Sequence, residues 1–344
     1  MKIRKAALAM LLASALTLSL ASCSGSNDQS NNPSNSQTPS GDNAIELKIQ
    51  GAWSENDSNN RLVNEFIDKV AEKTNGTVTI QWGGGPEAIP QNQQSEALKN
   101  GVIDILWTCH TYMSSHVPVL QGMKLTDATQ LRSNGGYDYV ASLYADGFNG
   151  AKYLGQMCDG LPYALYTKEK VQSIDDFKGL TFRATPAYQA FVEALGSGAS
   201  NMDPGDAYQA LENNVIQGYG WPAVGIKDYA WNEVSKYIIS TTFYNTDTCV
   251  VVSGKTWDKL SSDQQSALLE VAEELESGTK GYFEQAIEDE WAALVDGGME
   301  ILDLPEDVAK EYHQIAYDAA WAGVTATDAE NAAVLMSYTD YEAS

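Results

Sequence analysis

The sequence predicts an α/β protein of two lobes, each formed by a doubly wound sheet flanked by helices. The chain has 344 residues, too many for one compact core of typical size. Strand-like alternation of polar and apolar residues takes turns with helix-like 3.6-residue periods, near the start of the chain and again in its middle. Short connections join these segments, as they do in parallel sheets whose strands alternate with helices.

The first lobe is expected to begin with a half-buried strand at residues 46–50, where polar and apolar side chains alternate. A helix capped by Asp57 or Ser58 follows and stops at Asn75-Gly76. Its apolar positions are Leu62, Val63, Phe66, Ile67 and Val70. The next elements are a strand at 77–82, a helix at 91–99 and a strand at 102–107. This order predicts a parallel sheet.

The second lobe repeats the theme. Residues 163–166 and 180–183 have strand character, and Thr185-Pro186 predicts an N-cap with proline in the first turn of a helix that ends near Leu195. Further elements are a helix at 205–213, strands at 215–219, 236–243 and 248–253, and mostly helical structure from residue 262, including an acidic amphipathic run to about 295. We expect one lobe to comprise 44–160 with about 249–288, and the other 161–248 with about 289–344.

The N-terminus has the pattern of a signal peptide. Residues 1–5 are basic, residues 6–20 are almost uninterrupted small and apolar side chains, and Leu20-Ala21-Ser22-Cys23 resembles the bacterial lipobox. That resemblance implies cleavage after residue 22 and a diacylglyceryl anchor on Cys23. Residues 23–43 are rich in Ser and Asn and predict a flexible tether. We therefore expect a lipoprotein anchored to the cell membrane and facing the periplasm or the outside. An ordinary secretory signal with a chance cysteine is the alternative.

Charge excludes several classes of protein. After residue 22 the chain has 18 basic and 46 acidic side chains, which repel phosphate backbones and anionic lipid headgroups. Nucleic-acid binding is thereby excluded, and no later run approaches the ~20 apolar residues of a membrane span. The apolar fraction of 43% supports real cores, so a disordered acidic chain is excluded as well.

Motifs for catalysis or metal binding are missing. There is no P-loop, no G-x-S-x-G elbow and no zinc spacing among Cys109, Cys158 and Cys249. His110 and His116 lie six residues apart, which is not an established metal spacing. We expect neither a catalytic centre nor a metal or other cofactor. An oxidising compartment permits one disulfide among the three later cysteines, and the pairing is open.

Binding residues are expected past the carboxyl ends of the strands, where open α/β sheets bind their ligands. Arg183 ends one such strand just before a predicted helix, so its guanidinium can meet an anion beside helix N-terminal amides. A surface pair with an aspartate is the alternative for Arg183. Trp53, Trp107 and Trp221 lie near other strand ends and suit a small organic acid with an apolar body. Trp107 fits a core position equally well, and Glu87 fits a helix cap or a contact between the lobes.

Two stretches carry a family resemblance. Residues 174–184 (IDDFKGLTFRA) with 191–196 (FVEALG), and residues 207–218 with their Y-x-A-L-x-x-x-V-x-x-G pattern, resemble the DctP-type solute-binding proteins of tripartite ATP-independent periplasmic (TRAP) transporters. The resemblance covers about residues 45–260. It implies a periplasmic-binding-protein-like fold whose cleft closes on a carboxylate-bearing solute, and a separate membrane permease that receives the solute. It also implies that Arg183 pairs with the ligand carboxylate.

Two departures from the family pattern narrow the expected ligand. Tyr163 stands where many members have a second arginine, and Trp221 replaces a ligand-contacting asparagine. One cation with an indole favours a monocarboxylate, such as a 2-oxo, 2-hydroxy or aromatic acid, because a second buried charge would lack compensation. A C4-dicarboxylate requires Tyr163, Thr108 or backbone donors for its second carboxylate. Sialic acid and ectoine are not expected. The predicted ligand-binding residues are Arg183, Trp221, Trp53, Tyr163, Glu87, Thr108, Trp107 and Tyr219.

The expected function is that of a non-catalytic receptor that delivers a small organic acid to TRAP permease subunits. Three alternatives stay open at this point. An ABC-type sugar-binding lipoprotein would stack its tryptophans on sugar rings and would not need Arg183. A surface hydrolase would turn over a substrate, and an adhesive surface protein would bind no small ligand.

Overall fold

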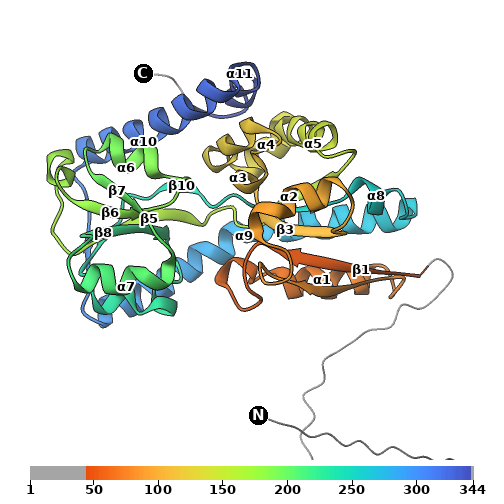
Figure 1. Ribbon diagram of the computed structural model, residues 1–344, viewed down its shortest axis with the longest axis horizontal. Helices are drawn as coiled ribbons and strands as arrows, with labels where there is room; N and C mark the ends of the chain where they lie inside the picture. Colours follow the sequence, from red (N-terminus) through yellow and green to blue (C-terminus); the bar gives the residue numbers. More distant parts are fainter. Residues whose placement is uncertain (1–43, 342–344) are drawn as a thin grey trace, which may run out of the picture. The chain divides into compact units, whose positions relative to one another are not determined.

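The computed structural model describes residues 44–341, all of which belong to one compact unit of the chain. The predicted signal peptide, the lipidation of Cys23 and the tether lie outside the described residues. Within 44–341, two sheets are flanked by helices (Figure 1). Each sheet has a hydrophobic cluster of its own, and a third, larger cluster joins residues of both sheets, such as Leu106 of the first and Phe182 of the second. The two-lobe α/β fold expected from the sequence is confirmed. The exact boundaries of the lobes stay a prediction.

The first sheet has five strands in the order β2-β1-β3-β11-β4. They are β1 (Ile45–Gly51), β2 (Val78–Gly84), β3 (Ile105–Cys109), β4 (Lys152–Gln156) and β11 (Thr248–Val252). β1 pairs in parallel with β2 and β3, as predicted. β11 lies antiparallel between β3 and β4, so the sheet is mixed.

Helices flank the first sheet, and α1 does so through an apolar face. In α1 (Val63–Lys73), the buried residues Val63, Phe66 and Val70 follow the helical period and join the core beneath β1. The other helices of this part are α2 (Gln91–Lys99), α3 (His110–Met113), α4 (Ala128–Asn134), α5 (Gly136–Gly147) and α8 (Gly254–Trp257), with 3-10 helices η1 (Ser58–Asn60) and η2 (Pro118–Leu125).

The second sheet has the order β12-β9-β5-β8-β6-β7, with β10 paired to β5. Its strands are β5 (Pro162–Thr167), β6 (Thr181–Ala184), β7 (Gly198–Asn201), β8 (Gly218–Pro222), β9 (Tyr237–Ile239), β10 (Phe243–Asn245) and β12 (Glu300–Leu302). β6 is parallel to β7 and β8, whereas β5 is antiparallel to β8 and β9. Around it are α6 (Gln189–Ala194), α7 (Pro204–Glu212), η3 (Ile174–Phe177), η4 (Ile226–Tyr229) and η5 (Trp231–Glu233).

Long helices connect the two sheets. α9 (Ser262–Asp296) begins at a capping box formed by Ser261 and Gln264. Its early residues, such as Leu268, enter the core of the first sheet, and Leu294 enters that of the second. α10 (Glu306–Thr327) packs on both α6 and η2 and is followed by α11 (Ala329–Met336) (Figure 1). One helix therefore contributes to both cores.

The strands expected at 102–107 and 215–219 begin three residues later, as β3 and β8. Two other predicted elements differ more from the structure. The strand expected at 236–243 is divided into β9 and β10, which pair with β5 at different places. The helix expected from Thr185 begins only at Gln189. The Thr185 carbonyl instead accepts hydrogen bonds from the amides of Tyr188 and Gln189, which forms a turn. This turn brings the Tyr188 side chain to the backbone of β8, as described below.

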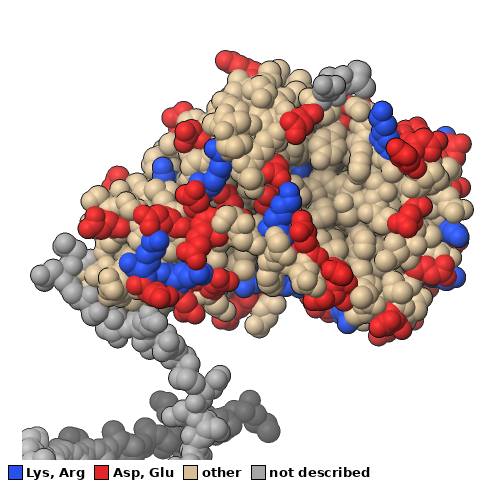
Figure 2. Space-filling view, turned by 180° about the vertical axis from the view of Figure 1, so that it is seen from behind, with Lys and Arg blue, Asp and Glu red and all other residues tan. Residues whose placement is uncertain are grey.

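The described residues contain neither a disulfide nor a metal-binding cluster. Cys109, Cys158 and Cys249 are buried and unpaired, so none of the disulfides left open by the sequence is formed. Between residues 44 and 341, no group of histidine, cysteine and acidic side chains could hold a metal ion. In the same range, no helix is long and apolar enough to cross a membrane. Figure 2 shows acidic and basic side chains interspersed on the face opposite to that of Figure 1.

Candidate functional site

Arg183 is a buried cation without a carboxylate partner. It lies on β6 and is 4% exposed. No acidic oxygen within residues 44–341 lies within 4.0 Å of its guanidinium. Nε donates to the Met202 carbonyl oxygen at 3.3 Å, and Nη1 donates to the Tyr188 hydroxyl at 3.0 Å. A buried charge held only by neutral acceptors is costly, and an anion beside it would compensate that cost.

Two indoles lie against this guanidinium. Its central carbon is 5.2 Å from the ring centre of Trp221 and 5.9 Å from that of Trp231. The ring of Tyr229 stacks on Trp231 at 5.0 Å, which extends the aromatic wall. Both indole N–H groups are buried and have no acceptor among the described residues. The guanidinium is thus stabilised by the faces of the indole rings, and the indole N–H groups of Trp221 and Trp231 have no described acceptor.

Groups of the first sheet face the same region. The rings of Trp53, after β1, and Tyr112, in α3, lie 6.0 Å apart. Burial raises the pKa of the Tyr112 hydroxyl, and among the charges that act on this hydroxyl are Asp57, which adds to the rise, and Arg183, which opposes it. The pKa of Tyr229 is raised by the same cause and is subject to the same two charges. Tyr112 of the first half and Tyr229 of the second therefore both lie within electrostatic range of Arg183.

The family model described as bacterial extracellular solute-binding protein, family 7 (DctP), matches residues 49–324. The chain belongs to the DctP family. The resemblance drawn from the two sequence stretches is confirmed, and it places Arg183 and its surroundings within the matched range.

Curated relatives of this DctP-family chain are distant. A solute-binding protein of Chromohalobacter salexigens is 23% identical over 73% of this chain and 77% of its own length. The sialic acid-binding periplasmic protein SiaP of Vibrio cholerae is 36% identical, over 28% of this chain and 31% of its own. An uncharacterised Haemophilus influenzae protein is 29% identical over 48% of this chain, which spans 44% of that protein.

Solved structures share the fold. A TRAP periplasmic solute-binding protein from Desulfovibrio salexigens with bound orotic acid gives a TM-score of 0.73 at 20% identity, covering 85% of this chain and 97% of that one. DctP7 of Bordetella pertussis, which binds pyroglutamic acid, gives 0.71 at 16% identity, covering 86% and 99%. A protein from Chromohalobacter salexigens with bound D-glucuronate gives 0.72 at 20% identity, covering 86% and 99%.

The predicted binding residues of this DctP-family protein separate into two groups. Trp221, Trp53 and Tyr163 are partly exposed, and Trp221 touches Arg183 directly. The Tyr163 ring lies 5.4 Å from the ring of Tyr188, whose hydroxyl holds Arg183. Trp221, and Tyr163 through Tyr188, therefore lie beside Arg183, whereas Trp53 lies against Tyr112.

The other predicted residues make contacts within the fold. Trp107 lies in the core, and its indole donates to the Asn59 carbonyl oxygen at 3.0 Å. Tyr219 is stacked on Tyr166 in the second core. Glu87 accepts a hydrogen bond from the Gly85 amide at 2.5 Å, which closes its own loop and lowers its pKa. Thr108 is buried on β3. Ligand contact by these four stays a prediction, and we do not build the proposed site on them.

A second buried cation has no sequence signal. Lys124, in η2, donates to the Ala187 carbonyl oxygen, and its ammonium lies 5.1 Å from the centre of the Tyr244 ring. Burial lowers the pKa of Lys124 to about 8, and the charge of Asp247 opposes this change. No motif or periodic pattern surrounds Lys124 in the sequence, which is why it is absent from the predicted residues.

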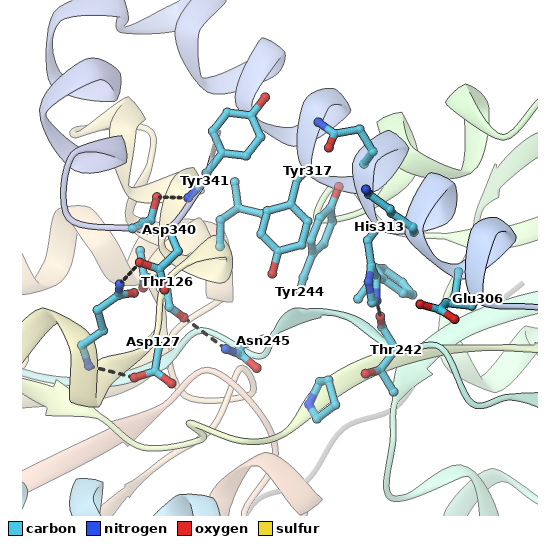
Figure 3. A pocket seen from close by; sticks show the side chains of 18 residues that line it. Thr126, Asp127, Thr242, Tyr244, Asn245, Glu306, His313, Tyr317, Asp340 and Tyr341 are labelled. Atoms are coloured by element: carbon cyan, nitrogen blue, oxygen red, sulfur yellow. Dashed lines mark hydrogen bonds between the residues drawn. The ribbon is translucent and has the colours of Figure 1, made fainter. Parts of the chain in front are cut away.

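A cavity of about 870 Å³ lies away from Arg183 (Figure 3). Its walls come from residues 125–127 and 242–245, from α10 and from residues 339–341. Tyr244 and Tyr317 lie side by side in it, and His313 reaches the Thr242 carbonyl (Figure 3). The described residues that line the cavity include three acids, Asp127, Glu306 and Asp340, and one lysine, Lys310. Its net negative charge does not suit an anionic ligand.

A glycine marks where the two halves meet near Trp221. Gly225 has φ +101°, and a Cβ there would lie 3.3 Å from Ser58 Oγ and 3.4 Å from Trp221 Nε1. We expect Gly225→Ala to reduce the free energy of unfolding by about 1–2 kcal/mol through left-handed strain, with an additional loss from these contacts. Urea unfolding measures the total loss in free energy of unfolding. Gly298→Ala is the matched control, because Gly298 has φ +102° and nothing near its Cβ. Equal losses of unfolding free energy in the two variants would show that the contacts with Ser58 and Trp221 add nothing to the cost of the left-handed conformation.

Proposed function

We propose that this protein is the extracytoplasmic receptor of a TRAP transporter and binds a small organic monocarboxylate through Arg183. One observation carries the proposal. Arg183 is a buried guanidinium whose Nη2 has no acceptor within residues 44–341. It lies against Trp221, next to which Ser58 of the first half approaches Gly225 of the second. A carboxylate is the planar anion that an arginine fork matches best.

The comparisons support an acid as the ligand. Three of the similar structures hold orotic acid, pyroglutamic acid and D-glucuronate, each of which carries a carboxyl group. The aromatic groups Trp53, Tyr112 and Trp221 would then select the shape of the part of the ligand that bears no charge. A monocarboxylate is favoured because Tyr163 offers only a neutral hydroxyl where a second arginine is common.

Capture would proceed by closure of the two halves on the acid, which shifts the population toward the closed state. The closed receptor would present one surface to the membrane permease, which receives the acid. Anchoring through lipidated Cys23 and the tether would keep the receptor near that permease. No step of this cycle needs a covalent change in the ligand, so we propose a receptor and not an enzyme.

An ABC-type sugar receptor is the alternative from the sequence, and membership of the DctP family argues against it. The acid receptor and the sugar receptor differ in their need for Arg183. A neutral sugar would bind equally well without Arg183, whereas an acid would not.

Thermal unfolding of residues 44–344, which include all the described residues, tests the proposal. The panel contains orotate, pyroglutamate, D-glucuronate, pyruvate, lactate, benzoate, succinate and glucose. An acid at 100 times its dissociation constant should add about 2.7 kcal/mol of stability. We expect Arg183→Ala to weaken binding of that acid at least about tenfold, and Arg183→Lys to recover only part, because lysine lacks the fork.

The outcomes separate the candidates. A shift by a monocarboxylate that Arg183→Ala removes supports the proposal. A stronger shift by succinate would indicate a dicarboxylate ligand in place of a monocarboxylate, and its second carboxylate would then need Tyr163, Thr108 or backbone donors. A shift by glucose that is equal in wild type and Arg183→Ala would overturn the carboxylate mechanism.

A further inference from the structure

Tyr188 connects Arg183 to the backbone of β8. Its hydroxyl accepts a hydrogen bond from Arg183 Nη1 at 3.0 Å and donates one to the Gly220 carbonyl oxygen at 2.6 Å. Because the carbonyl can only accept, the hydroxyl proton must point to Gly220. A lone pair of the oxygen is therefore left facing the guanidinium, which is the orientation that a cationic donor needs.

The Tyr188 ring has no room to swing away. It is 2% exposed, lies 5.4 Å from the ring of Tyr163, and meets Phe243 edge-on at 5.9 Å. Gly220 allows this close approach, since a Cβ at that position would stand 2.5 Å from the ring. The phenol is thus locked by packing and by its own hydrogen bond, and it can hold a partner in one place.

The remaining contacts of Arg183 complete the constraint. Nε is taken by the Met202 carbonyl, and the ring of Trp221 covers a face of the guanidinium. In a guanidinium, Nε and Nη2 share one edge, so a carboxylate cannot pair along that edge while Met202 holds Nε. What remains for an anion is Nη2 and one N–H of Nη1.

We propose that Tyr188 is the positioning residue that orients Arg183 toward the carboxylate of the ligand. The inference rests on the proposed function only for the identity of the anion, since the orientation itself is a property of the free protein. Tyr188→Phe removes the acceptor while keeping the ring. We expect it to free the guanidinium to rotate and to weaken acid binding about tenfold, the size typical of a hydrogen bond to a charged group.

The first test needs no ligand. Residues 44–344 contain three arginines, Arg61, Arg132 and Arg183, so nitrogen-15 NMR of the guanidinium groups gives few signals. We expect separate Nη1 and Nη2 signals for Arg183 in the wild type, because the fixed group rotates slowly. In Tyr188→Phe these signals should merge. If they stay separate as in the wild type, Tyr188 does not orient Arg183 and the inference is overturned.

Tyr244→Phe is the matched control. Tyr244 is also buried, and its hydroxyl donates to the Ala316 carbonyl oxygen at 2.6 Å, but it does not touch Arg183. This variant should lose a similar amount of stability and leave the Arg183 signals unchanged. Merged signals in both variants would mean that loosening of the core, and not Tyr188, frees the guanidinium.

The second test uses the acid of the panel that wild type binds most tightly, and its primary amide. We expect Tyr188→Phe to lower the affinity for the acid about tenfold and to leave that for the amide nearly unchanged. In the Arg183→Ala background, Tyr188→Phe should have no further effect. Equal losses for acid and amide would overturn the positioning role. If no acid binds the wild type, the proposed function fails, while the NMR experiment still decides the role of Tyr188.

Discussion

Replacing Glu276 by alanine should lower the free energy of unfolding by about 3 kcal/mol, measured by urea denaturation. The Glu276 side chain in α9 is 4% exposed and pairs with Arg132 of α4. Its other oxygen accepts a hydrogen bond from the Gln156 amide at 2.6 Å, at the end of β4. Removing the carboxylate leaves the guanidinium, which stacks on Tyr137 at 4.1 Å, without its buried partner. The amide also loses its acceptor, and both losses add to the cost.

Glu273 supplies the control for this change. It lies on the same helix, 3.9 Å from the same guanidinium, but its side chain is 63% exposed. Glu273→Ala should cost less than 1 kcal/mol, as exposed ion pairs generally do. Similar costs for the two alanine variants would show that burial does not set the strength of the pair.

Replacing Asp159 by asparagine should stabilise the protein at pH 7 and flatten its dependence on pH. Burial raises the pKa of Asp159 to about 6, and Asp127 adds to this effect. Its Oδ1 has no hydrogen-bond partner among the described residues. Between about pH 4 and 6 the native state therefore holds a proton that the unfolded state has lost, so stability falls as pH rises through this range. Asparagine lacks this loss, which is worth up to about 3 kcal/mol.

Urea unfolding of the wild type and Asp159→Asn at pH 4, 5, 6 and 7 tests whether the stability of the wild type falls relative to the variant as pH rises. The advantage of Asp159→Asn should grow up to about pH 6 and stay constant above it. Asp176→Asn provides the opposite case, because hydrogen bonds from the Gln172 and Ser173 amides lower the pKa of that carboxyl. Its removal should cost stability at pH 7. An advantage of Asp159→Asn that is independent of pH would contradict titration of the native carboxyl.

Local patterns predicted the elements well where pairing is local in the chain. The parallel set β1, β2 and β3 follows from alternation and short connections, and these elements fall close to their expected residues. The insertion of β11 between β3 and β4 could not be predicted in this way. It depends on residues 248–252 meeting residues 105–109, and no periodicity records a pairing over such a separation.

The residues of the candidate site were predicted only in part, because local sequence patterns do not show which side chains meet in the fold. Arg183 was identified by its place at a strand end and by the family resemblance. Tyr188 was missed because the Thr185-Pro186 signal assigned it to a helix, whereas a turn directs its hydroxyl to Arg183. Trp231 and Tyr112 were missed because short helices without a periodic pattern carry them. Trp107 lies on β3, whose residues are all buried, so the sequence shows no alternation that would tell whether the indole faces the core or a ligand.

The position of β11 also governs the order in which the molecule can be completed. β11 lies between β3 and β4, yet its residues 248–252 follow all the strands from β5 to β10 in the chain. A chain that emerges from its N-terminus, from a ribosome or from an export channel, has no finished first sheet until β11 has emerged. By then nearly all of the second sheet is outside as well. The first sheet therefore gains its last strand only after most strands of the second sheet are available, so the two sheets are completed at nearly the same stage.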